Sequence, residues 1–250
     1  MRNALGPSYS PAERLDTFMK FLGYGNPFEP FPGRKGSLWF IGIEEALDSC
    51  ETSSADASVI KCYGKQWKHT DVDATTEKTG VYVTIAKLAV LLNEAARSDG
   101  EEHCHRDADN WATYRRNELF QEHSRAGVFQ TNLYPLGKPR ATEPLPTHYW
   151  EIFGFDDSNS YQRICENQRW QDIRNLKSQA HPWLTICFGK NYWDKFSACL
   201  KLGEKESRGQ FELYKRDGVI LTPFFSSRPN CMPNKRILEL ASIIRSFPFT

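Results

Sequence analysis

Four short and almost uniformly apolar runs are spread along the chain, each followed by a segment that contains glycine or proline. They span residues 37–42 (SLWFIG), 127–132 (GVFQTN), 183–189 (WLTICFG) and 218–223 (GVILTP). Runs of this length without polar alternation are typical of strands that are buried on both faces of a parallel sheet. They constrain the fold strongly, because such a sheet needs helices on both of its faces.

Helical patterns lie between and around these runs. The three clearest cover residues 81–97, 168–180 and 234–246. In the first and the last, apolar residues recur at helical spacing, and His181-Pro182 closes the second just before a strand. Alternating strands and helices predict an α/β fold with three layers, α/β/α, around a central sheet of four mostly parallel strands.

The composition fits one globular domain. Hydrophobic residues make up 40% of the 250 residues, which is ample material for a core. We expect a single domain over residues 1–250, with a long polar insertion at about residues 46–79. The 32 Lys and Arg residues against 31 Asp and Glu residues give a formal net charge of +1. This balance excludes a polybasic tail binder and an acidic disordered activator, so any positive charge that meets a nucleic acid must be local.

The chain shows no sign of a membrane or metal partner. Residues 1–7 lack the apolar core of a signal peptide, and residues 85–92, the longest apolar stretch, are far fewer than the roughly 20 that span a bilayer. We therefore expect a soluble, cytoplasmic protein, and a monomer. Seven scattered cysteines without a C-x-x-C pair argue against disulfides and iron–sulfur clusters. We interpret His103-Cys104-His105 as a polar loop, because no second ligand pair lies at zinc spacing.

Chemistry is expected in the segments that follow the four predicted strands, because ligands of open α/β sheets bind beyond the carboxyl ends of the strands. These segments supply carboxylates, the amide of Asn132, aromatic rings and a Pro/Ser/Arg-rich loop. Such a set suits a planar, uncharged, hydrogen-bonding ligand, and a nucleobase fits that description. No dinucleotide-binding fingerprint, phosphate loop or nucleophile elbow is present, and we expect no metal or organic cofactor.

The order of these motifs resembles the uracil-DNA glycosylase superfamily. Gly42-Ile43-Glu44-Glu45-Ala46 looks like the first motif of that family. Thr131-Asn132-Leu133-Tyr134-Pro135-Leu136 looks like the second, especially in the Asn-x-x-Pro-Leu form of the single-strand-selective monofunctional branch. Phe225-Ser226-Ser227-Arg228-Pro229-Asn230 lies where the closing loop before the last helix is expected. The resemblance implies the family's α/β fold and the excision of a base from DNA.

Carried over to this chain, the resemblance implies roles for several residues. Glu44 would orient or deprotonate water and stabilise the positive charge that develops on the sugar. Asn132 would read the edge of a flipped base through its amide, and Tyr134 is the aromatic residue that we favour for stacking. Contacts with DNA phosphates or the minor groove are expected from Lys138, Arg140, Ser226, Ser227, Arg228 and Asn230.

Three departures from the family pattern bear on the substrate. Glu45 stands in place of a proline and adds a second carboxylate, and Ala46 replaces the bulky group that excludes 5-substituted bases. The closing loop has no histidine, and Phe225 or Ser226 takes its place, so the electrophile expected beside a departing uracil anion is missing. These changes favour a larger or modified base. Modified cytosine in phage DNA is one candidate, which would imply a role in antiphage defence.

Each of these residues also has a purely structural interpretation. Glu44 could cap the helix that follows it, and Asn132 could be a turn residue that bonds its own backbone. Tyr134 and Phe225 could be ordinary core aromatics, and the basic residues could lie on solvated loops. The occurrence of the motifs in the family's order favours a functional role for Glu44 and Asn132.

We therefore predict a monofunctional DNA glycosylase that hydrolyses the N-glycosidic bond of a flipped base, in single- or double-stranded DNA, and leaves an abasic site. No lysine occupies an obvious position for a Schiff base, which argues against lyase chemistry. Two alternatives stay open. The protein could be a catalytically inactive sensor that binds DNA or a base, or a hydrolase of small-molecule nucleosides.

Overall fold

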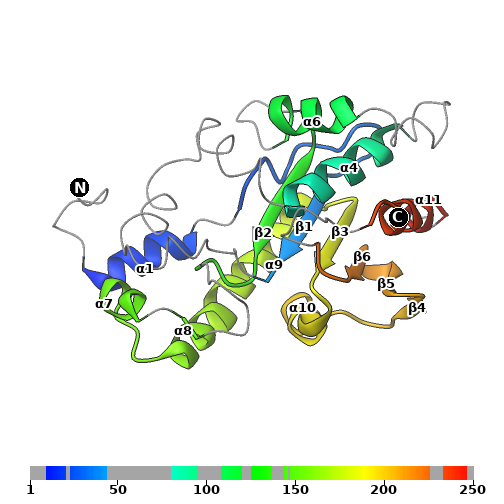
Figure 1. The fold of residues 1–250 in the computed structure, drawn as a ribbon. Coiled ribbons are helices and arrows are strands. Elements are labelled where there is room, and N and C mark those ends of the chain that lie inside the picture. The colour runs from blue at the N-terminus through cyan, green and yellow to red at the C-terminus, as the bar shows by residue number, and fades with distance from the viewer. Residues whose placement is uncertain are drawn as a thin grey trace.

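Strands and helices alternate along the chain, which confirms the predicted α/β class (Figure 1). The computed structural model describes residues 10–20, 23–43, 80–94, 108–119, 125–136, 144–145, 147–225 and 233–246. The polar insertion expected at about residues 46–79 lies outside the described residues.

A six-stranded sheet with the order β2-β1-β3-β6-β5-β4 forms the centre of the described structure. Its strands are β1 (Leu38–Gly42), β2 (Val128–Asn132), β3 (Leu184–Phe188), β4 (Glu206–Arg208), β5 (Phe211–Tyr214) and β6 (Val219–Thr222). Strands β2, β1, β3 and β6 are parallel, and the β5–β4 hairpin adds antiparallel to β6. The four predicted strands are present, but the prediction of a four-stranded sheet is wrong because it missed this hairpin.

The hairpin was missed because its outermost strand, β4, is polar. Strand β4 has the sequence ESR and is half-exposed to exposed along its length, so it lacks the apolar run that marks a buried strand. Gly209, in the turn that leads to β5, has a φ of 57°, a left-handed value that favours glycine. Glu206 accepts hydrogen bonds from Arg208 at 2.8 Å and Lys215 at 2.6 Å. A short, charged edge strand of this kind discourages further strand pairing.

The carboxyl ends of the four parallel strands meet at one edge of the sheet. Gly42 at the end of β1 is paired with Asn132 at the end of β2. The β1–β3 register brings Gly42 level with Phe188, and Phe188 is paired with Thr222 at the end of β6. These four residues therefore form a row across the strand ends, which is where open parallel sheets bind their ligands.

Helices cover both faces of the sheet (Figure 1). One face carries α4 (Gly80–Glu94), α6 (Ala108–Asn117) and α11 (Asn234–Ser246). The other carries α9 (Trp170–Ala180) and α10 (Trp193–Leu200). The bounds of α11 agree with the predicted helix over residues 234–246. Three further helices, α1, α7 and α8, lie towards one end of the molecule and span Pro11–Lys20, His148–Phe153 and Ser158–Ile164.

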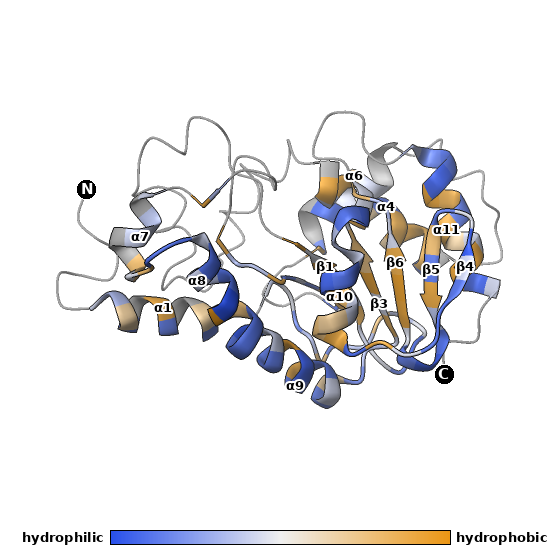
Figure 2. Cartoon of the chain, turned by 90° about the horizontal axis from the view of Figure 1, so that it is seen from below, coloured by the Kyte–Doolittle hydropathy of each residue, from blue (hydrophilic) through white to orange (hydrophobic). Residues whose placement is uncertain are grey.

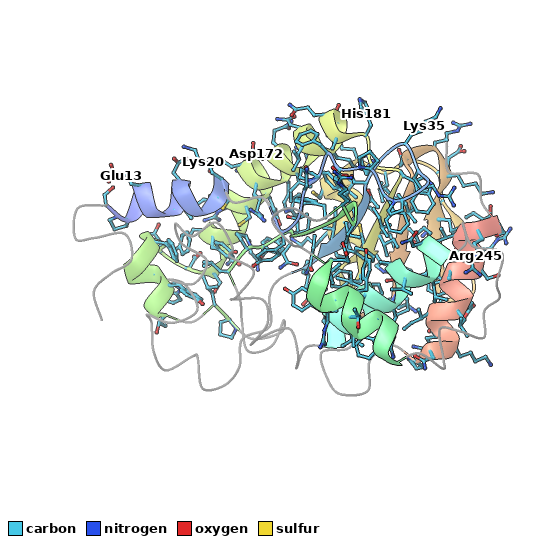
Figure 3. All side chains as sticks on the ribbon, turned by 90° about the horizontal axis from the view of Figure 1, so that it is seen from above. Glu13, Lys20, Lys35, Asp172, His181 and Arg245 are labelled. Carbon is cyan, nitrogen blue, oxygen red and sulfur yellow. The ribbon has the colours of Figure 1, made fainter. Side chains whose placement is uncertain are left out.

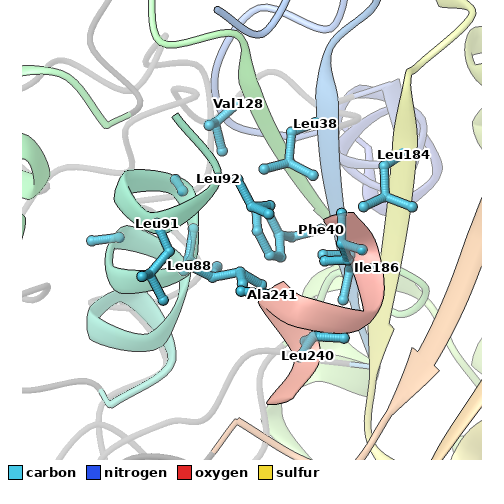
Figure 4. Close-up of a cluster of buried hydrophobic side chains, with 14 of the residues drawn as sticks. Leu38, Phe40, Leu88, Leu91, Leu92, Val128, Leu184, Ile186, Leu240 and Ala241 are labelled. Carbon is cyan, nitrogen blue, oxygen red and sulfur yellow. The ribbon is translucent and has the colours of Figure 1, made fainter. Parts of the chain in front are cut away.

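The two faces of β1 pack into two separate hydrophobic cores. Leu38 and Phe40 lie in the core beneath α4 and α11 (Figure 4), whereas Trp39 and Ile41 belong to the core beneath α9 and α10. All four side chains are fully buried. Because successive residues of a strand point to opposite faces, a strand covered on both sides must be apolar at every position. Figure 2 shows this pattern, with β3 and β6 hydrophobic along their length.

Most of the exposed side chains in the part of the chain that the structure describes are polar or charged. Charged side chains such as Lys20 and Asp172 project outward from their helices (Figure 3). Within the described residues, the exposed large hydrophobic side chains are Phe28 and Phe224, with 55% and 45% of their surface accessible. None of the described helices combines the length and the apolar character that crossing a bilayer would require.

Candidate functional site

The structure describes three of the residues that the sequence marks as candidates, namely Asn132, Tyr134 and Phe225. The others lie outside the described residues: Glu44, Glu45, Ala46, Lys138, Arg140, Ser226, Ser227, Arg228 and Asn230. Asn132 and Phe225 are both found at the carboxyl ends of the parallel strands, in or next to the row formed by Gly42, Phe188 and Thr222. Their surroundings show what this edge of the sheet can bind.

Asn132 directs its side-chain oxygen over the backbone of Gly42. That oxygen occupies the space that a Cβ atom on residue 42 would need, and the ring of Phe188 borders the same space. The backbone here is fixed by two hydrogen bonds, from Leu133 N to the Gly42 carbonyl at 3.0 Å and from Tyr134 N to the Ile43 carbonyl at 2.8 Å. Glycine at position 42 is thus what allows the carboxamide to lie across the strand ends.

An aromatic group lies beside this carboxamide. The rings of Phe188 and Phe225 stack with centroids 4.6 Å apart and an interplanar angle of 9°. Phe225 also meets Phe40 at 6.2 Å and is completely buried, so it is part of the core. Phe224 packs against Phe188 at 6.2 Å but keeps 45% of its surface exposed. Of the two neighbours, Phe224 therefore presents an aromatic surface to solvent.

The segment after β3 adds a cation to the same edge. Gly189, with a φ of 130°, turns the chain from β3 into η2 (Lys190–Tyr192) and α10. Trp193 is anchored because its indole N–H donates to the Thr222 carbonyl at 3.1 Å. The ammonium group of Lys190 lies 5.8 Å from the centre of the Trp193 ring, and Lys190 is exposed. An exposed cation beside an aromatic group suits a phosphate or a base.

Tyr134 lies in the core beneath α9 and α10. Its ring is 4% exposed and packs against Tyr161 and Trp170 at 6.2 and 6.1 Å. The Tyr134 hydroxyl donates to Glu166 Oε1 at 2.8 Å, and Lys195 Nζ donates to the same oxygen at 2.6 Å. Whether Tyr134 stacks on a base stays a prediction, and in this structure its ring faces are covered by protein.

These contacts shift the pKa values of Tyr134 and Glu166 in opposite directions. Burial raises the pKa of Tyr134 far above its usual value, and its hydrogen bond to Glu166 raises it further. For Glu166, burial acts to raise the pKa, but the hydrogen bonds from Lys195 and Tyr134 outweigh it and lower the pKa. Tyr134 therefore remains a neutral hydrogen-bond donor, and Glu166 an ionised acceptor, at neutral pH.

A π-helical turn, η1 (Cys165–Arg169), joins α8 to α9 and holds the end of β2. Arg169 is 2% exposed and donates from Nε to the Asn132 carbonyl at 2.9 Å and from Nη2 to Thr131 Oγ1 at 3.2 Å. Its Nη1 donates to the Met19 carbonyl at 3.4 Å. Burial lowers the pKa of Arg169, but a guanidinium group stays charged in proteins.

Sequence reasoning missed Glu166, Arg169 and Lys195, although they surround the segment that carries Asn132. Residues 165–169 read CENQR, which in a sequence is indistinguishable from the solvated side of an ordinary helix. A buried arginine leaves no signal in hydrophobic periodicity, because charged residues are normally assigned to the surface. Within the described residues, no group of three or more His, Cys, Asp or Glu side chains could hold a metal ion.

Comparison with known proteins gives no match, either to a protein-family model or to a curated protein. The arrangement at the strand ends is therefore the basis for assigning a function. It combines the Asn132 carboxamide over Gly42, the aromatic group of Phe188 and Phe224, and the exposed cation of Lys190.

Proposed function

We propose that the protein is a monofunctional DNA glycosylase of the uracil-DNA glycosylase type, which acts on a flipped base at the carboxyl edge of the parallel strands. The observation that carries the proposal is the carboxamide of Asn132, fixed over Gly42 beside the ring of Phe188. A carboxamide offers a donor and an acceptor side by side, so it can pair with the hydrogen-bonding edge of a base. The ring of Phe224, which packs against Phe188 and keeps 45% of its surface exposed, can contact the face of that base.

In this proposal, Glu44 activates the attacking water. It comes two residues after Gly42, the last residue of β1, and Gly42 is paired with Asn132. A carboxylate there would take a proton from water and would stabilise the positive charge on the sugar as the base departs. Glu45 adds a second negative charge beside it. The products are the free base and an abasic site, and no metal or organic cofactor takes part.

The proposed substrate is a modified or bulky base, such as a modified cytosine of phage DNA, since Ala46 leaves more room than the bulky group of the family pattern. DNA would be held by Lys138, Arg140 and the loop residues Ser226, Ser227, Arg228 and Asn230. A formal net charge of +1 fits a few phosphate contacts around one nucleotide, with a modest dependence of affinity on salt. We propose that the protein works as a monomer in the cytoplasm.

The test is a panel of oligonucleotides that carry different modified bases, incubated with the protein and treated with alkali to cleave abasic sites. The wild type is expected to release at least one base. Glu44→Ala should abolish release, and Asn132→Ala should slow it about 10- to 100-fold, as expected for the loss of two hydrogen bonds. Asn175→Ala, on the exposed side of α9, is the matched control and should be unchanged. Base release by Glu44→Ala at the wild-type rate would refute the catalytic assignment.

A non-catalytic sensor is a second candidate, favoured by one observation. Phe225 is one of the two residues that take the place of the expected histidine, and it is fully buried against Phe40 and Phe188. A phenyl ring has no hydrogen bond to donate to a departing base anion. Binding of DNA without release of any base would therefore favour the sensor, and release from free nucleosides but not from DNA would favour a small-molecule hydrolase.

A further inference from the structure

We infer that Arg169 is a positioning residue, which acts from the π-helical turn η1 to fix the Asn132 carboxamide in its base-reading orientation. The inference rests on the proposed function, because it assigns a role relative to the base that Asn132 would read. Arg169 itself does not reach the substrate in this scheme. It acts through the backbone and side chain of the two residues that end β2.

The contacts of the guanidinium group carry the inference. Nε donates to the Asn132 carbonyl at 2.9 Å, and Nη2 donates to the hydroxyl of Thr131, the preceding residue, at 3.2 Å. The planar fork of an arginine sets the angle between these two bonds, which a lysine cannot do. On the other side, Leu133 N donates to the Gly42 carbonyl at 3.0 Å. The peptide group that follows the Asn132 Cα is thus held at both its carbonyl and its N–H, and the preceding residue is held by its side chain. Together these bonds fix the backbone from which the Asn132 side chain extends.

Two side chains of the π-helical turn, those of Glu166 and Arg169, reach this segment. In η1 the Trp170 N–H bonds back to the Cys165 carbonyl, a five-residue step that widens the helix. Arg169 holds Thr131 and Asn132, and Glu166, three residues earlier in the same turn, accepts the hydrogen bond of the Tyr134 hydroxyl at 2.8 Å. π turns inside helices are rare and are found frequently at functional sites. Here the turn holds the end of β2 on both sides of the base-reading residue.

If Arg169 only stabilised the fold, its substitution should have different consequences, and another arginine of the chain serves as the control. Arg174, on α9, which continues directly from η1, donates from Nη1 to the Cys199 carbonyl at 2.8 Å and is half-buried. Like Arg169 it bonds a backbone carbonyl, but at the end of α10 and not at the strand ends. If the two arginines serve only to stabilise the fold, Arg169→Lys and Arg174→Lys should have similar consequences.

The experiment compares full-length Arg169→Lys and Arg174→Lys with the wild type by two readouts. One is the side-chain NH₂ resonance of Asn132 in ¹H–¹⁵N NMR spectra, assigned by its loss in Asn132→Asp. The other is single-turnover base release, measured together with the dissociation constant for the same oligonucleotide. We expect Arg169→Lys to shift the Asn132 resonance and to slow release by about 100-fold, the loss that a small misplacement of a reacting group can cause. The dissociation constant should change less than about threefold.

Arg174→Lys should leave the Asn132 resonance and the rate of release at wild-type values. Thr131→Val, which removes only the acceptor of Nη2, keeps the test valid if Arg169→Lys fails to fold, and it should shift the same resonance with a smaller loss of rate. The inference would be overturned if the Asn132 resonance stayed in place in both Thr131→Val and Arg169→Lys. It would also be overturned if Arg174→Lys shifted this resonance and slowed base release as much as Arg169→Lys does. If the wild type releases no base at all, the proposed function fails, and the NMR comparison still decides whether Arg169 positions Asn132.

Discussion

The side-chain oxygen of Asn132 occupies the space in which a Cβ atom on Gly42 would stand. The two residues are paired across β1 and β2, at the last position of each strand. A glycine at this point is therefore required by its neighbour's side chain and not by an unusual backbone angle. Gly42 therefore contributes to the proposed recognition of a base, because its missing side chain leaves room for the Asn132 carboxamide.

Gly42→Ala should displace the Asn132 carboxamide and leave the sheet in place. The added methyl group would overlap the Asn132 oxygen and come within 3.0 Å of the Phe188 ring. Because the carboxamide can rotate away more easily than the strand can move, we expect base release to fall about 10- to 100-fold, with a loss of less than about 2 kcal/mol in unfolding free energy. Oligonucleotide cleavage and urea unfolding measure the two quantities.

Gly203→Ala is the matched control for this change. A Cβ atom on Gly203 would meet only Asp217 Oδ2, at 3.7 Å, which is an ordinary van der Waals contact. This variant should keep both the activity and the stability of the wild type. Full activity in Gly42→Ala would show that the carboxamide does not need its position over β1.

Substitution of the two adjacent phenylalanines after β6 should affect different properties, stability for Phe225 and DNA binding for Phe224. Phe225 is fully buried, so Phe225→Ala should lower the unfolding free energy by about 3–5 kcal/mol. Phe224 keeps 45% of its surface exposed, so Phe224→Ala should cost less than about 1 kcal/mol. If the exposed ring stacks on a base, Phe224→Ala should instead weaken binding of the substrate oligonucleotide by about 1–3 kcal/mol.

Urea denaturation and a binding titration separate these two effects. The contrast would fail if Phe224→Ala destabilised the protein as much as Phe225→Ala does. Unchanged oligonucleotide binding in Phe224→Ala would remove this ring from the proposed site, and Phe188 would remain as the aromatic neighbour of Asn132.

Much of the sheet could be predicted from the sequence because burial on both faces leaves an uninterrupted apolar signal. Strands β1, β2, β3 and β6 carry that signal, and the rule that ligands bind beyond parallel strand ends directs attention to Asn132. Strand β4 carries no such signal, since its three residues are polar and lie at the edge. Arg169 was beyond prediction for another reason. Its role depends on long-range contacts with Thr131 and Asn132, which local periodicity does not encode.

Glu166 should make stability depend on pH in the acid range. Burial acts to raise its pKa, but hydrogen bonds from Lys195 and Tyr134 bring the pKa below the ordinary value of 4.5. The folded protein therefore binds this proton less readily than the unfolded chain does. The stability that Glu166 contributes is present above about pH 4.5 and is lost as the pH falls through its lowered pKa.

Urea unfolding from pH 7 to pH 3 tests this sign. The difference in unfolding free energy between the wild type and Glu166→Gln should be largest at neutral pH and should shrink towards pH 3. Glu204→Gln, on the exposed loop after α10, controls for the loss of one negative charge. A difference that stays constant or grows on acidification would contradict the coupling of Glu166 to Lys195 and Tyr134.

The buried cysteines should be inert towards alkylation while the protein is folded. Cys165, Cys187 and Cys199 are free thiols in the core beneath α9 and α10. Burial raises the pKa of Cys165 and of Cys199 to about 12, and it raises that of Cys187 well above the usual value. Only the thiolate reacts with iodoacetamide, so peptide mapping at pH 8 should find these three residues unmodified in buffer and modified in urea. Rapid native alkylation of Cys187, which lies in the central strand β3, would mean that the sheet and its covering helices separate readily.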